Sequence, residues 1–236
     1  MAMITQQYFL TQITTKLGKI EMGIDKILEF LYGDKKAELI AEVTFTKFAM
    51  KNYSSVMTRE TQKTATIQSL QNGKKVAMKD IEFYMNELSR VTKGKENVDI
   101  LLDKACRVKE CLELSIQLYV MNMLLEVYYA ENFDSEYLKY IENEATMYIS
   151  KCEKRILSKF SELRILIAKH KDTLLKKLDQ DALLEKINDV MAAYEDGSES
   201  EISKTLHKYL EFPKTPTDYY ISSLGDVYMK KAQQPV

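Results

Sequence analysis

The residues that could carry out catalysis are few, and the two histidines, His170 and His207, are the first to consider. Histidine is the most common acid–base residue in enzymes. Arg164 lies six positions before His170. Metal sites in helical bundles use Glu-x-x-His pairs, and the sequence contains neither such a pair nor a glycine-rich phosphate-binding motif. The sequence therefore offers one candidate catalytic pair and predicts no metal and no cofactor.

The segment from Arg164 to His170 resembles the motif of HEPN-type ribonucleases, in which a histidine follows an arginine at short range. Those enzymes are helical bundles, and the resemblance implies that Arg164 stabilises a phosphate and that His170 acts in acid–base cleavage of RNA, usually across a dimer. It covers seven residues, and Ile165 stands where the family commonly has a polar residue. Positions six apart do not share a helix face, so the alternative is two separate surface side chains.

The cysteines indicate a reducing compartment. Cys106, Cys111 and Cys152 are odd in number and show no C-x-x-C spacing, which predicts free thiols rather than disulfides or a zinc site. The N-terminal residues lack the basic region and apolar run of a secretory signal. We therefore expect a cytoplasmic protein.

Proline usage indicates the fold class. All three prolines, Pro213, Pro216 and Pro235, lie near the end of the 236-residue chain, and glycine occurs only seven times. Chains rich in β-structure need both residues at their many turns, whereas helix interiors exclude proline. The formal net charge of -1 disfavours a dedicated nucleic-acid coat protein. We predict an all-α fold, an elongated bundle of five to seven long helices.

A heptad repeat occupies residues 10–31. Its apolar positions alternate in spacings of three and four, as in a coiled-coil seam. These positions are Leu10, Ile13, Leu17, Ile20, Ile24, Ile27 and Leu31. Leucine or isoleucine at position a with isoleucine at position d disfavours parallel dimers and favours higher-order association, but the same pattern also serves packing within one chain. The seam predicts an interface with a second copy, a helical partner, or the rest of the bundle.

Apolar periodicity and turn signals divide the remainder of a single domain, residues 1–212, into helices. Asn72-Gly73 predicts a turn after a polar, threonine-rich stretch, and Asp134 predicts the N-cap of the longest helix, whose apolar residues repeat every eleven positions. The expected helices are 35–57, 74–92, 97–131, 134–178, 179–195 and 199–212. The tail, residues 213–236, either docks on the bundle or binds a partner.

The stretch 112–130 is apolar on nearly all sides. Its only charged residues are Glu113 and Glu126, and Ser115, Asn122 and Glu126 form a narrow polar stripe. This pattern predicts the central helix of the bundle. The alternative is a membrane-active protein, similar in layout to helical pore-forming proteins, that shelters this segment. Two carboxylates within a membrane span would be costly, which disfavours that alternative.

The sign of the charge reverses late in the chain. Residues 151–178 contain nine basic and three acidic residues, and residues 179–201 contain eight acidic residues and one lysine. An antiparallel hairpin would bring the two stretches together. The alternative is a free basic face, 151–178, that contacts RNA or an anionic membrane.

These patterns together favour a non-enzymatic interaction or scaffold protein that assembles through coiled-coil-like helices. Self-association or binding of a helical protein partner is the expected interaction, and the seven heptad residues are the expected interface. Ribonuclease activity of Arg164 and His170 and membrane activity of 112–130 are the alternatives, so the sequence leaves an enzymatic function open.

Overall fold

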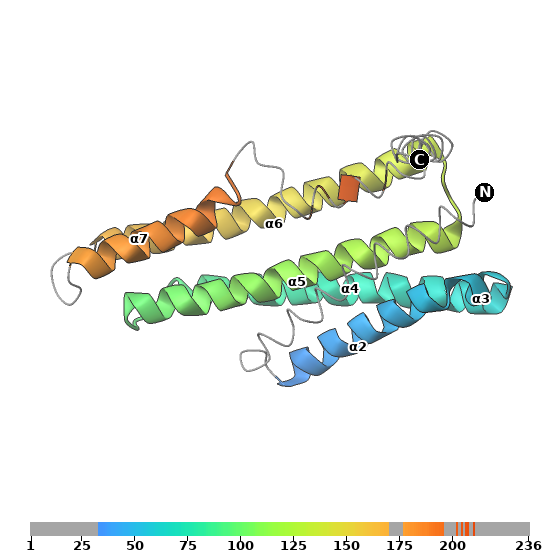
Figure 1. The fold of residues 1–236 in the computed structure, drawn as a ribbon, viewed down its shortest axis with the longest axis horizontal. Coiled ribbons are helices and arrows are strands. Elements are labelled where there is room, and N and C mark those ends of the chain that lie inside the picture. Colours follow the sequence, from blue (N-terminus) through green and yellow to red (C-terminus); the bar gives the residue numbers. More distant parts are fainter. Residues whose placement is uncertain are drawn as a thin grey trace, which may run out of the picture.

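The computed structural model describes residues 33–169 and 177–195, together with the single positions 202, 204, 206, 207 and 210. These residues form six helices and no strand, which confirms the all-α prediction (Figure 1). The helices are α2 (Gly33–Lys51), α3 (Tyr53–Met57), α4 (Glu60–Val91), α5 (Val98–Ala130), α6 (Ser135–Lys169) and α7 (Lys177–Ala192). The heptad segment 10–31 with its seven interface residues, His170, and the tail 213–236 lie outside the described residues.

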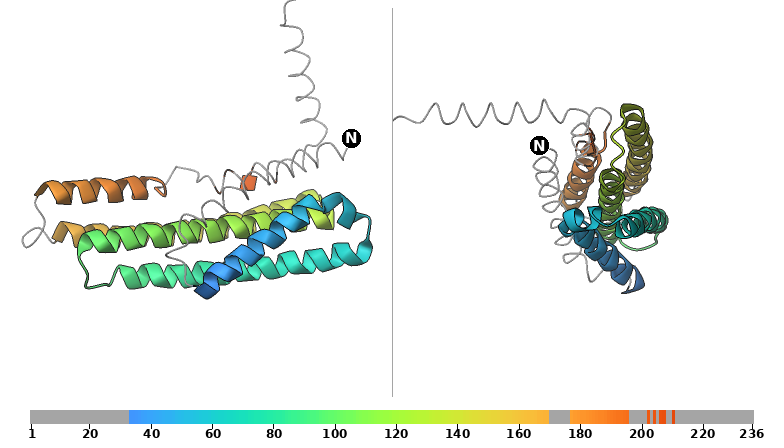
Figure 2. Two further views of the ribbon diagram at one scale, coloured as in Figure 1. Left: turned by 60° about the horizontal axis from the view of Figure 1, so that its bottom comes forward. Right: turned by 90° about the vertical axis from the view of Figure 1, so that its right-hand side faces the viewer.

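Helix α5 lies in the middle of the bundle. It contacts α2, α4, α6 and α7, which surround it in the view along the bundle axis (Figure 2). Every residue from Leu118 to Leu125 is buried. The apolar stretch 112–130 is therefore packed against the other helices as a core element. Among the described helices, none has the length and apolarity that crossing a bilayer requires.

The polar stripe of α5 faces partners on neighbouring helices. Asn122 is completely buried and accepts a hydrogen bond from Thr46 on α2 (Oγ1 to Oδ1, 3.0 Å). Glu126 accepts one from Gln71 on α4 (2.8 Å). Ser115 donates to the backbone carbonyl one turn earlier in α5 (2.9 Å). Because buried polar groups need such partners, these bonds select one arrangement of α2 and α4 against α5.

The predicted turn at Asn72-Gly73 is wrong, because α4 runs through it without interruption. Gly73 is buried where α4 crosses α2 and α5. A Cβ atom at Gly73 would lie 2.5 Å from Glu42 Oε2 and 2.8 Å from Asn122 Nδ2. This glycine therefore permits close packing of three helices, and the packing of α4 outweighs the local turn tendency of Asn-Gly.

The helix expected over 35–57 is divided in two at Asn52. The side-chain Nδ2 of Asn52 donates to a backbone carbonyl one turn earlier (2.9 Å), which competes with continuation of α2. Just beyond the break, the hydroxyl of Tyr53 donates to the backbone carbonyl of Tyr128 on α5 (3.0 Å). Tyr129 donates in return to the backbone of α2 (2.5 Å). These reciprocal bonds hold the α2–α3 junction on the C-terminal end of α5.

Helix α6 begins as predicted but ends earlier. Asp134 is its N-cap, since Oδ1 accepts the backbone N–H groups of Glu136 and Tyr137, both at 3.0 Å. The prediction of one helix over 134–178 is wrong, because α6 ends at Lys169 and a separate helix, α7, begins at Lys177. The side chain of Gln180 on α7 donates to the backbone carbonyl of Ile167 on α6 (3.0 Å), which joins the two helices.

The apolar stripe of α6 follows the eleven-residue repeat as far as the helix extends. Its fully or almost fully buried members are Leu138, Ala145, Ile149, Cys152, Ile156, Phe160, Leu163 and Ile167. Leu178, assigned to the same stripe from the sequence, belongs to α7, and Leu174 lies outside the described residues.

Helix α7 folds back along α6, as the hairpin interpretation of the charge reversal requires (Figure 1). Just beyond its end, the hydroxyl of Tyr194 donates to Glu113 on α5, and Lys109 lies 3.0 Å from the same carboxylate. This is how the protein accommodates one of the two carboxylates of the apolar stretch. Further along, Leu206 and Leu210 are completely buried, and Nδ1 of His207 lies 2.8 Å from Glu142 Oε1 on α6.

Candidate interaction surfaces

The pair Arg164 and His170 does not form a site in the described part of the chain. Arg164 is exposed near the C-terminal end of α6, and the neighbouring Ile165 is also exposed. His170 lies outside the described residues. The structure therefore adds no geometric support to the ribonuclease resemblance.

The three cysteines are free thiols with little nucleophilic character. Burial raises the pKa of Cys111 to about 12 and that of Cys152 to about 11, and it also raises the pKa of Cys106. The thiolate is the reactive form of cysteine. All three side chains are therefore protonated at neutral pH and serve as packing residues.

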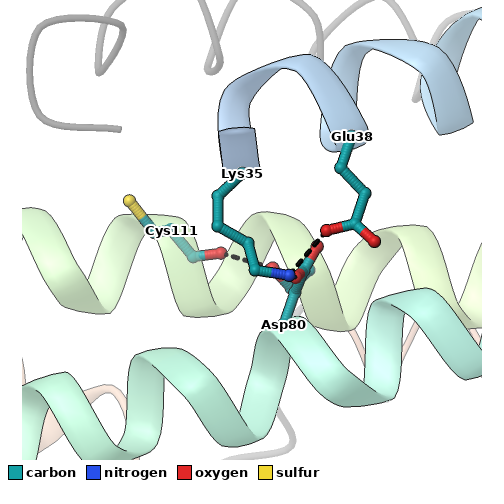
Figure 3. A network of polar contacts seen from close by, with 5 residues as sticks. Lys35, Glu38, Asp80 and Cys111 are labelled. Atoms are coloured by element: carbon teal, nitrogen blue, oxygen red, sulfur yellow. Dashed lines mark hydrogen bonds and ion pairs between the residues drawn. The ribbon is translucent and has the colours of Figure 1, made fainter. Parts of the chain in front are cut away.

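One buried charge pair connects α2 to α4. Asp80 on α4 is only 1% exposed, and its Oδ1 lies 2.6 Å from Lys35 Nζ near the start of α2 (Figure 3). Lys35 also contacts Glu38 one turn along α2 (2.5 Å). Burial raises the pKa of Asp80 against the opposing effect of Lys35. Burial would lower the pKa of Lys35, but the hydrogen bonds to Asp80 and Glu38 outweigh it and the pKa is raised. Asp80 is closed off from solvent, so this cluster is a structural element.

A groove with a volume of about 640 Å³ lies between α4 and α6. Met85 and Ser89 line it from α4, and α6 lines it from Thr146 to Lys159. The α6 side contributes four basic side chains, which are Lys151, Lys154, Arg155 and Lys159. No acidic side chain lines this groove. The groove thus combines four basic side chains from one helix, and we call it the α4/α6 groove.

Two of the four cations of the α4/α6 groove are neutralised and two are not. Arg155 forms a bidentate ion pair with Glu82 across the two helices (2.6 and 3.0 Å), and Lys159 pairs with Glu162 (2.7 Å). Lys151 and Lys154 are exposed and form no ion pair with any described residue. The groove therefore carries uncompensated positive charge on one turn of α6.

The Arg155–Glu82 pair should make the protein more sensitive to acid. The hydrogen bonds from Arg155 hold the pKa of Glu82 below its usual value of 4.5. A carboxylate whose pKa is lowered by folding stabilises the folded state above its unfolded pKa, and this contribution is lost as pH falls through the folded pKa. Glu82→Gln should therefore lower the melting temperature above about pH 5, with a difference that shrinks below about pH 4. Thermal melts of both proteins across this pH range test it, and a difference that does not depend on pH would contradict it.

A second candidate surface is the outer face of α2. Five residues on one side of this helix are exposed and uncharged, namely Ala37, Ile40, Ala41, Thr44 and Phe48. Phe48 is 54% exposed. The hydroxyl of Thr44 donates to the carbonyl of Ile40 within the same helix (2.8 Å), so this hydroxyl has a hydrogen-bond acceptor without a polar group from a partner. We call these five residues the α2 outer face.

Comparison of the chain with protein-family models, curated proteins and solved structures gave no match. The fold and the two surfaces place the protein in the class of all-α helical bundles. Any function must therefore be argued from the surfaces themselves.

The sequence pattern located one half of the α4/α6 groove and missed the other. The basic stretch 151–178 included its four cations. The contribution of α4, through Met85 and Ser89, could not be recognised in the sequence, because these residues are spaced as in any amphipathic helix. The α2 outer face was not predicted from the sequence either.

Proposed function

We propose that this chain is a non-enzymatic interaction protein whose copies assemble through the heptad seam 10–31 and the α2 outer face. The proposal rests on the heptad register of the segment 10–31 and its continuation into α2. Counted in sevens from Ile13, the next d positions on α2 are Asp34, Ala41 and Phe48, and the last two are exposed. Beyond the charged residues Asp34 and Glu38, the α2 outer face therefore returns to uncharged residues at the d positions of the seam.

The exposure of Phe48 supports a partner on this side. Removing a phenylalanine side chain from water is worth about 1.5–3 kcal/mol, and Ile40 lies on the same exposed face. In a heptad interface a residue at position d is a knob that inserts between residues of the facing helix. A second copy would supply a matching stripe, so that self-association buries both faces at once.

Light scattering coupled to size exclusion tests the proposal. The wild-type protein should elute as an oligomer, and Leu17→Asp together with Ile24→Asp should reduce it to a monomer, because unpaired charges at buried seam positions are costly. Phe48→Glu should weaken the assembly in the same direction.

The matched control is Ile100→Glu, which introduces the same charge at an exposed apolar residue of α5, away from the heptad pattern. It should leave the mass unchanged. A monomeric wild-type protein, or an unchanged mass in the Leu17→Asp and Ile24→Asp double variant, would contradict assembly through the seam.

A further inference from the structure

We propose that the α4/α6 groove binds an acidic amphipathic helix of a partner protein. The proposal concerns a surface separate from the self-association face and does not depend on it. It rests on three properties of the groove: its length, its apolar lining, and its unneutralised lysines.

The dimensions of the groove suit a helical segment. The residues that line it on α6 extend from Thr146 to Lys159, which corresponds to about 20 Å along a helix axis. A partner helix of about four turns would lie along this length. Helices that bind in this way place apolar residues at positions i, i+3 or i+4, and i+7 into the groove and keep polar residues on the outside.

Two methionines on opposite sides form the apolar part of the lining, and Met147 supplies its exposed surface. Met85 on α4 is buried at the base, and Met147 on α6 is 75% exposed. Methionine is unbranched and polarisable, so it adapts its shape to different apolar side chains and is frequent at surfaces that bind helices. Met147 would be covered by the apolar face of a docked helix, which gives its exposure a physical reason.

The charged part of the lining selects an acidic partner. Lys151 and Lys154 lie three residues apart on α6 and form no ion pair with a described residue, although the charge of Lys151 helps to lower the pKa of Glu82, the partner of Arg155. Glutamate or aspartate residues along the flank of a docked helix would pair with the two lysines. Complementary charges of this kind increase the association rate and determine the orientation of the helix.

A protein helix fits these observations better than a nucleic acid does. Single-stranded nucleic acids are bound on aromatic side chains that stack with bases, and no aromatic residue lines the groove. The only arginine of the lining is already paired, and the chain as a whole has a formal net charge of -1. A basic groove with a methionine base therefore points to a ligand with an apolar face as well as negative charge.

The first experiment is a selection from a displayed library of random peptides of about 15 residues, the length of a four-turn helix. Wild-type protein is the bait, and the Lys151→Glu, Lys154→Glu double variant is the counter-selection. We expect enrichment of sequences with apolar residues at helical spacing and flanking acidic residues. No enrichment, or enrichment of peptides without acidic residues, would overturn the proposal.

The second experiment measures the affinity of the enriched peptide by fluorescence polarisation. The Lys151→Glu, Lys154→Glu variant should bind at least roughly tenfold more weakly, and higher salt should reduce the wild-type affinity. The matched control, Lys139→Glu with Lys169→Glu, reverses two exposed lysines of the same helix outside the groove and should stay within roughly twofold of the wild type. Equal losses of peptide affinity in both double variants would mean that only the net charge of the protein matters. That result would overturn the assignment of the α4/α6 groove as the binding site.

Met147→Ser distinguishes a helix from a purely anionic ligand. It should weaken peptide binding by roughly fivefold to tenfold, because it removes apolar contact and leaves every charge in place. Oligouridylate and phosphatidylserine vesicles are tested in parallel. If either binds through Lys151 and Lys154, is insensitive to Met147→Ser and no peptide is enriched, the groove is a phosphate-binding surface and the proposal is wrong. The Leu17→Asp, Ile24→Asp variant should retain peptide binding, which separates this test from that of self-association.

Discussion

Leu124→Ala should lower the free energy of unfolding by about 2–5 kcal/mol. Leu124 is completely buried in the middle of α5, and its neighbours on both sides in sequence are buried as well. Truncation removes apolar contacts and leaves a cavity that long helices packed side by side can only partly close. Chemical denaturation followed by circular dichroism measures the loss, provided that the slope of the transition is unchanged.

Ile100→Ala is the matched control for this prediction. It removes a side chain of similar size from the same helix, but Ile100 is 43% exposed near the N-terminal end of α5. The loss should be under about 1 kcal/mol, because much of this side chain is already in contact with water. Similar losses in the two variants would mean that Leu124 does not lie in a packed core. That outcome would instead support the alternative that the stretch 112–130 is a membrane-active segment.

The second large effect should come from Lys35→Met. This variant leaves the carboxylate of Asp80 buried without its cation, and removing one partner of a buried ion pair typically costs about 3–5 kcal/mol. We expect the lower end of this range, because the Lys35 side chain keeps some contact with solvent. Unfolding in denaturant at neutral pH measures the loss.

A double variant and a change of pH identify the cause of that loss. Lys35→Met combined with Asp80→Leu should recover most of the stability, since neither charge is then left unpaired. Burial raises the pKa of Asp80, so protonation stabilises the folded state as pH falls through that pKa. The cost of Lys35→Met should therefore be smaller at about pH 4 than at pH 7. Lys79→Met, at an exposed lysine of α4, should cost little, and an equal loss there would rule out the buried pair as the reason.

The features that depend on local periodicity could be predicted from the amino-acid sequence. The apolar positions of α6, from Leu138 to Ile167, repeat at helical spacing, and any helix with that pattern must bury them. The same holds for α5, whose apolar residues surround the helix and require a central place. Asp134 was recognised as an N-cap because its bond to the following backbone N–H groups involves only adjacent residues.

The division of the chain into separate helices and the pairing of helix faces depend on contacts between distant residues, which the sequence pattern does not reveal. Gly73 carries the local signal of a turn, yet the crossing of α2, α4 and α5 uses it as the point of closest approach inside one long helix. The end of α6 gave no sequence signal, because the apolar spacing continues into α7. The tertiary structure instead shows α7 as a separate helix, whose Gln180 donates back to Ile167, thirteen residues earlier. The α4/α6 groove likewise exists only because Met85 and Lys151, far apart in the chain, lie on neighbouring helices. Periodicity reports which face of a helix is buried, whereas the length of a helix and its choice of neighbour depend on contacts between residues distant in sequence.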